Sequence, residues 1–358
     1  MKFGVILDPH IEKWDLIRYA EELGYTRVGV GDSQMIWSDC YAVLTLAAVN
    51  TKRILLGTGV AIPGTRIAPV TAHSVATLNQ LAPGRVFCGI GTGHTAMRVM
   101  GQDPMPIREF REYVRVVRAL LDGHAVDYTY RDKTREIQFL HREWRFINLE
   151  HRIPIYVAAN GPKALEVVSE YGDGWITSGG DVRAIRQNLE SIRSTASKMG
   201  RRLPVDFVTM CVLGVCVLRP GERLSDERVV NETGAVVTLL LHFTYEIWEQ
   251  LGRREEAVPP YFRDVWDEYV KRVAGFEAKS RFRRIHDGHL TFLQEEERRF
   301  VTPEAIQATC LAGEPDEIIE RIRELENSGI QEIALLSPAD YQRKVYRDVA
   351  ELVLPAFR

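Results

Sequence analysis

Short apolar runs alternate along the chain with longer stretches whose apolar residues recur at helical spacing. After the first run, Trp14, Ile17 and Leu23 recur in a stretch that stops at Gly24, a common helix-ending residue. Eight runs have the length and β-branched content of strands: 3–8, 27–33, 54–62, 86–93, 153–160, 174–180, 205–218 and 332–338. Strands that are apolar on both faces are typical of a parallel sheet covered by helices. Eight such units predict a (β/α)₈ TIM barrel rather than an open sheet.

One connection is too long for a single helix. Residues 219–311 separate the seventh run from the eighth and contain several helical stretches, among them 236–252 and 261–276. We interpret 219–311 as an insertion over the barrel mouth, within a single domain that spans 1–358. The charged and aromatic segment 125–150 has the pattern of a hairpin.

Composition excludes several classes of protein. A net charge of -3 gives no basic footprint for nucleic acid. The N-terminal sequence lacks the apolar core of a signal peptide, and the longest apolar stretch, 208–218, is too short to span a bilayer. The five cysteines are scattered without a C-x-x-C pair, so we expect a reduced, cytoplasmic protein. We also expect a homodimer or a higher homo-oligomer that acts on a small molecule.

In a barrel, the chemistry lies at the carboxyl ends of the strands. The fourth run ends in Gly91-Thr-Gly-His-Thr-Ala96, which matches the G-x-G-x-x-A pattern of dinucleotide-binding folds. The match follows the fourth strand, and no acid-ended strand lies about 20 residues further on, as that fold requires. A ligand loop at the barrel mouth is favoured, and a simple tight turn remains the alternative.

Two other strand ends have unusual composition. Residues 158–164, AANGPKA, place Asn160 and Gly161 before a proline that starts a helix, next to Lys163. Free backbone N–H groups there predict an anion site, and a plain βα turn is the alternative. Residues 57–66, GTGVAIPGTR, contain too many strand-breaking residues for a regular strand, so we predict a bulge.

Single residues are less specific. Trp37 either lines a pocket or packs in its loop, and His94 is either an acid–base group or a turn residue. His286 and His289 have metal-ligand spacing, but no further ligand cluster accompanies them, so we predict no metal site. Asp8, at the first strand end, is expected to be ionised and able only to accept a proton.

Three stretches together resemble one family. Residues 56–93, 153–176 and 311–338 resemble the luciferase-like flavin-dependent oxidoreductases, and most closely the branch that uses the deazaflavin coenzyme F420. The likeness covers most of 1–218 and 311–358 and is weak across the insertion. It implies a luciferase-like barrel.

The resemblance also implies roles for individual residues. Asp32 matches an acid that contacts the isoalloxazine region, and Gly59–Val60 match a pair joined by a non-prolyl cis peptide against the central ring. Matches to residues that line the coenzyme or cradle its phosphate are Thr92, Gly93, Ala159, Asn160 and Gly161.

The catalytic residues that we expect are His94, Trp37 and Ser33. Trp37 matches an active-site tryptophan of the F420-dependent sugar-phosphate dehydrogenases, whereas Ser33 stands where they have a histidine and His94 where they have a glutamate. Serine is no acid near neutral pH, whereas histidine titrates there, so we expect His94 to handle the proton. Glucose 6-phosphate is therefore not the expected substrate.

These observations lead to one expected function and two alternatives. We expect an oxidoreductase that transfers a hydride between coenzyme F420 and a small organic substrate. The first alternative is an FMN-dependent two-component monooxygenase that is supplied by a separate flavin reductase. The second is a flavin-binding protein without turnover.

Overall fold

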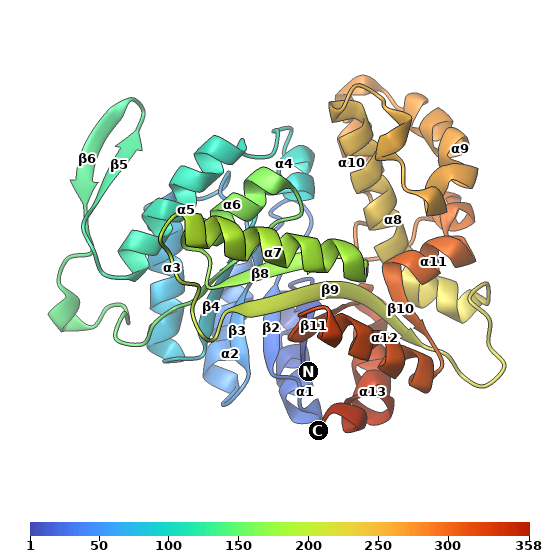
Figure 1. The fold of residues 1–358 in the computed structure, drawn as a ribbon, viewed down its shortest axis with the longest axis horizontal. Helices are drawn as coiled ribbons and strands as arrows, with labels where there is room; N and C mark the ends of the chain where they lie inside the picture. Colours follow the sequence, from blue (N-terminus) through green and yellow to red (C-terminus); the bar gives the residue numbers. More distant parts are fainter.

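The computed structural model describes all 358 residues and contains a closed parallel barrel. Its strands in chain order are β1 (Lys2–Leu7), β2 (Arg27–Val30), β3 (Leu55–Ala61), β4 (Val86–Ile90), β7 (Ile155–Ala158), β8 (Gly174–Ser178), β9 (Val208–Val217) and β11 (Glu332–Leu336). Each strand pairs with the next, and β9 pairs with both β8 and β11, which closes the ring (Figure 1). Every one of the predicted strands is present, and the TIM-barrel prediction is confirmed.

Helices cover the outside of the barrel. They are α1 (Asp15–Leu23), α2 (Cys40–Asn50), α3 (Ala68–Leu81), α5 (Ile107–Leu121), α6 (Pro162–Tyr171), α7 (Val182–Lys198), α12 (Pro315–Asn327) and α13 (Gln342–Leu352). The principal core of 62 buried residues lies between these helices and the strands. The short helix α4 (His94–Val99) instead packs in a small group of its own with Ile62. A smaller group inside the barrel includes Phe87, Tyr156 and Met210. The strands are therefore buried on both faces, which is why their sequences read as continuous apolar runs.

The first half of the segment predicted as a hairpin, 125–150, forms one, and the second half is loop with a short 3-10 turn at Arg142–Trp144. Strands β5 (Val126–Tyr130) and β6 (Lys133–Ile137) pair antiparallel and project away from the barrel (Figure 1). Arg131 and Asp132 form the turn with φ values of 47° and 63°, as a two-residue hairpin turn requires.

The long connection after β9 forms a second lobe, drawn from yellow to orange in Figure 1. It contains α8 (Glu227–Gln250), α9 (Arg263–Ala274), α10 (Arg281–Ile285) and α11 (Pro303–Thr309). These elements share a core of 20 buried residues, to which Cys216 of β9 and Leu336 of β11 also belong. The lobe is thus packed onto the barrel through the ends of two strands.

A further strand, β10 (Cys310–Gly313), was not among the predicted strands. It pairs parallel with the outer part of β9, so Cys310 and Leu311 belong to the sheet. The strand has only four residues and follows α11 without a turn, so no periodic signal separates it from the helix.

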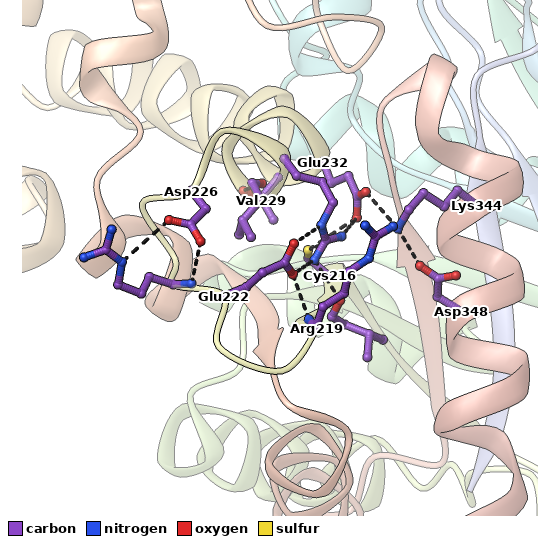
Figure 2. A network of polar contacts seen from close by, with 12 residues as sticks. Cys216, Arg219, Glu222, Asp226, Val229, Glu232, Lys344 and Asp348 are labelled. Carbon is purple, nitrogen blue, oxygen red and sulfur yellow. Dashed lines mark hydrogen bonds and ion pairs between the residues drawn. The ribbon is translucent and has the colours of Figure 1, made fainter.

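A polar network fixes the start of α8 to the barrel. Figure 2 shows Lys344 of α13 bridging the carboxylates of Glu232 and Asp348. The Glu232 carboxylate lies 3.0 Å from Lys344 Nζ and 2.9 Å from Arg228 Nη1, and it accepts a hydrogen bond from Cys216 Sγ. Glu232 is buried, so this carboxylate joins three elements at one point.

Two further observations concern the chain as a whole. None of its helices combines the length and the apolar character that crossing a bilayer would need. All five cysteines are free and buried.

Candidate active site

One cavity gathers the predicted site residues. It has a volume of about 640 Å³ and lies at the carboxyl ends of β2, β3, β4, β7 and β8, where a barrel places its chemistry. Its lining includes every predicted residue: Asp32, Ser33, Trp37, Gly59, Val60, Thr92, Gly93, His94, Ala159, Asn160 and Gly161. The volume is that of a small-molecule or coenzyme site.

The end of β3 is irregular, as its composition predicted. The pairing register with β4 shifts between Thr58 and Ala61, and the Gly59–Val60 peptide is cis. A Cβ on Gly59 would lie 2.9 Å from the backbone of Gly29 on β2, so only glycine fits there. Val60 is brought to the cavity wall by this bulge.

The start of α6 offers a backbone anion site. Gly161 caps the helix without a side-chain hydrogen bond, and Pro162 occupies its first turn, so backbone N–H groups are left for a ligand. Asn160 is held by β8, since it accepts from Thr177 Oγ1 at 3.0 Å and donates to Ser178 Oγ at 3.2 Å. Lys163 is the only lysine or arginine in the cavity lining.

The carboxylate of Asp32 is held by the chain itself. Arg66 Nη1 lies 3.1 Å from its Oδ1, and the N–H of Ile62 donates to its Oδ2 at 3.3 Å. Ser33 follows directly and is also buried. These contacts hold the Asp32 carboxylate at the cavity wall, next to an Arg66 side chain that also pairs with Asp39.

Residues from the long insertion complete the cavity. His94 begins α4 after Gly93, whose φ of 82° turns the chain at the end of β4, and Phe243 of α8 packs edge-on against the imidazole at 4.9 Å. Trp37 donates its indole N–H to Thr291 at 3.0 Å, so its ring rather than its N–H faces a ligand. His289 lies 5.6 Å from the Trp37 ring.

The charge state of His289 follows from its environment. Burial, together with the nearby His286 and His242, holds the pKa of His289 well below its usual range. His289 is therefore a neutral hydrogen-bonding group at pH 7.

Comparison with known proteins assigns a family. The model for the luciferase-like monooxygenase family matches residues 12–332, which is most of the chain. The chain belongs to this family.

Two named relatives match this chain over most of its length. The 5,10-methylenetetrahydromethanopterin reductase of Archaeoglobus fulgidus is 28% identical over 355 residues, with 96% of both chains covered. The F420-dependent glucose-6-phosphate dehydrogenase of Beutenbergia cavernae is 30% identical over 339 residues, which cover 87% of this chain and 94% of that protein. The resemblance noted in the sequence is thereby confirmed, and the chain is an enzyme of the luciferase-like family.

Solved structures agree on the fold. The coenzyme F420-dependent tetrahydromethanopterin reductase from Methanopyrus kandleri matches with a TM-score of 0.73 at 22% identity, covering 100% of this chain and 99% of that one. A monooxygenase from Streptomyces bottropensis matches with a TM-score of 0.64 at 21% identity and complete coverage of both chains. Both show the luciferase-like barrel.

The sequence did not point to several residues that line the cavity or lie next to it. Phe243, Ile247 and Leu290 line the cavity, but all lie in the insertion, where the family resemblance is weak. Glu246 and Arg98, both buried, form an ion pair of 3.0 Å next to His94. The only sign of Glu246 in the sequence is a carboxylate within an otherwise apolar helical stretch.

His286 and His289 lie in a buried polar network. No group of three or more histidine, cysteine, aspartate or glutamate residues is arranged to hold an ion. His286 instead shares a hydrogen bond of 2.6 Å between its Nε2 and Glu246.

Proposed function

We propose that this protein transfers a hydride between coenzyme F420 and a small organic substrate. The observation that carries the proposal is the convergence of all the predicted site residues on one cavity at the barrel mouth. The names of relatives that match along most of the chain support it, since one is an F420-dependent dehydrogenase and another a methylenetetrahydromethanopterin reductase.

The residues present fit this coenzyme. Backbone N–H groups at the start of α6, where no side chain caps the helix, would hold its phosphate with Lys163 beside them. Gly59–Val60 and Thr92–Gly93 would lie against the ring system, because small residues and exposed backbone allow close approach. When bound, the deazaflavin supplies a carbon centre that gives or accepts a hydride.

The chain's own residues would then orient the substrate and move one proton. His94 would exchange the proton, the Trp37 ring would form a wall, and neutral His289 would offer a hydrogen bond. Apart from Lys163, beside the proposed phosphate cradle, no lysine or arginine lines the cavity. A substrate with an uncharged polar group therefore fits better than a phosphorylated one.

Coenzyme titration tests the assignment. Gly161→Asp would set a negative charge against the phosphate and should abolish quenching of deazaflavin fluorescence. Gly180→Asp is a matched control, because a side chain at Gly180 meets no atom within 4 Å and this residue does not line the cavity. Unchanged affinity of Gly161→Asp would remove the phosphate assignment.

The absorbance spectrum of the reconstituted protein separates the remaining alternatives. Tight binding of FMN but not of the deazaflavin would favour a two-component monooxygenase that is supplied by a flavin reductase. Stopped-flow reduction of the bound coenzyme tests the non-catalytic alternative, since a purely sequestering protein would show no turnover with any substrate.

A further inference from the structure

A buried carboxylate stands directly behind His94. Glu246 lies on α8 with 1% of its side chain exposed. Its Oε1 is 2.6 Å from His286 Nε2, and its Oε2 is 3.0 Å from Arg98 Nε and 3.7 Å from His94 Nδ1. His94 and Arg98 both lie on α4, one turn apart, so Glu246 links α8 of the insertion to α4.

Glu246 is ionised at neutral pH. Burial by itself raises the pKa of Glu246, but the contacts with His286 and His94 and the charge of Arg98 outweigh burial and hold it at about 2. Burial lowers the pKa of His286, and that of His289 still further.

The groups that face this carboxylate come from every element packed around it: His94 and Arg98 on α4, His242 on α8, Tyr269 on α9, and His286 and His289 after α10. His286 and His289 are neutral at pH 7, while the Arg98 guanidinium carries a permanent charge. His94 is the one of these groups that also lines the coenzyme cavity and is partly exposed, at 32% of its side chain.

The position of Glu246 decides how His94 presents its two ring nitrogens. His94 Nδ1 is buried and has no hydrogen-bond partner, and Glu246 Oε2 likewise accepts no hydrogen bond. A carboxylate facing Nδ1 draws the proton of the neutral ring to that nitrogen and leaves Nε2 for the substrate. The same negative charge stabilises the doubly protonated ring that forms during proton transfer.

We infer that Glu246 is a positioning residue for proton transfer, which fixes His94 with Nδ1–H toward the insertion and Nε2 toward the substrate. This inference rests on the proposed function, because it gives His94 a substrate-derived proton to exchange. That proton arrives at or leaves from Nε2, and the Nδ1 proton stays in place throughout. The insertion thereby contributes to the acid–base group as well as to the cavity wall.

The chain contains its own matched control. Glu297 is equally buried and makes a parallel set of contacts, since its Oε2 is 3.0 Å from His242 Nε2 and its Oε1 is 3.4 Å from Arg272 Nη1. None of these three residues lines the cavity. Glu246→Gln and Glu297→Gln therefore remove the same charge from similar surroundings, but only the first removes it from His94.

The first test needs no coenzyme. Long-range ¹H–¹⁵N spectra show which nitrogen of each of the nine histidines carries the proton, and the spectrum of His94→Gln assigns the His94 signals. We expect neutral His94 to be the Nδ1–H tautomer in the wild type and in Glu297→Gln, and a mixture with Nε2–H in Glu246→Gln. An Nε2–H tautomer in the wild type overturns the inference, whether or not the variants fold and whichever coenzyme binds.

The second test uses the loaded enzyme. We expect Glu246→Gln to lower kcat about 10–100-fold with KM within a few fold, as for other residues that orient a functional histidine. Glu246→Asp, which restores the charge, should recover part of this loss, and Glu297→Gln should keep wild-type kcat. Wild-type kcat in Glu246→Gln would overturn the catalytic part of the inference, while the melting temperatures of the two glutamine variants control for general destabilisation.

Discussion

At the scale of single residues, most polar side chains of the cavity are already bound by other residues of the protein, and one titratable side chain is not. Asp32 is paired with Arg66, the Trp37 N–H is bound to Thr291, and both polar groups of the Asn160 amide are bound by β8. His94 alone combines a titratable ring with partial exposure to the cavity. The acid–base assignment therefore depends on this residue.

Replacing His94 tests that assignment. We predict that His94→Ala leaves coenzyme affinity within a few fold while turnover falls by about 10²–10⁴, the usual cost of removing a positioned acid–base group. His94→Gln keeps a hydrogen-bond donor but does not titrate, so the pH dependence of kcat should flatten. Steady-state kinetics across pH provides the measurement, and wild-type turnover in both variants would make His94 a turn residue.

Asp8 provides a prediction about stability. It lies at the end of β1 and binds the amide of Gln342, and burial raises its pKa to about 6. The pKa of Asp is near 3.9 in the unfolded chain, so the folded state holds the proton more tightly and loses stability as the pH rises from about 4 to about 6. The two pKa values differ by an amount that corresponds to about 3 kcal/mol.

We therefore predict that Asp8→Asn is more stable than the wild type by about 2–3 kcal/mol at pH 8 and equally stable at pH 4. The amide still accepts the hydrogen bond from Gln342, so the substitution removes only the charge. Urea unfolding at the two pH values measures the difference. An equal gain at both values would show that packing, not ionisation, is responsible.

At the scale of elements, the insertion is held at two places. The start of α8 is fixed to β9 and α13 through Glu232, and the later part of α8 reaches α4 through Glu246. Both contacts are ion pairs to buried carboxylates. Removing either carboxylate costs the charge-assisted hydrogen bonds that it accepts.

We predict that Glu232→Gln lowers the free energy of unfolding by about 1.5–3 kcal/mol, because the charge-assisted hydrogen bond from Arg228 is lost while Arg228 keeps Glu222 and Lys344 keeps Asp348 as partners. Asp348→Asn removes a more exposed carboxylate from Lys344, which also pairs with Glu232, and should lower the free energy of unfolding by only about 0–1 kcal/mol. Thermal and urea denaturation of the two variants test the difference. Similar losses of stability in the two variants would mean that buried Glu232 contributes no more than the exposed Asp348.

At the scale of the whole molecule, the cavity draws on both lobes. Its lining comes from β-strand ends of the barrel and from α8 and the segment after α10 in the insertion. A ligand that binds only this assembled state must stabilise the fold as a whole.

We predict that the deazaflavin at 100 times its Kd stabilises the protein by about 2.7 kcal/mol and raises its melting temperature accordingly. Gly161→Asp should show no such rise, whereas Gly180→Asp should show the full one. Differential scanning calorimetry with the deazaflavin and with FMN measures the effect. A rise with FMN alone would support the monooxygenase alternative.

The sequence by itself determined the barrel and most of the cavity lining that the barrel contributes. Apolar runs that are buried on both faces leave a strong local signal, and the glycines at Gly59 and Gly93 are required by backbone close approach or left-handed φ. The family resemblance then placed Asp32, Asn160 and Gly161, because a strand end carries its residue to the barrel mouth wherever the fold is the same. These features depend on neighbours in sequence or on a known topology.

Only the tertiary structure decided the part of the cavity next to the insertion. Glu246 is 152 residues from His94 in the chain, and no local pattern marks a carboxylate in an apolar helix as the partner of a distant imidazole. The raised pKa of Asp8, the paired state of Asp32 and the neutral state of His289 likewise depend on burial and on charges that folding brings together. Electrostatic interactions act through space at a few ångströms, so they could be determined only after the chain had been folded.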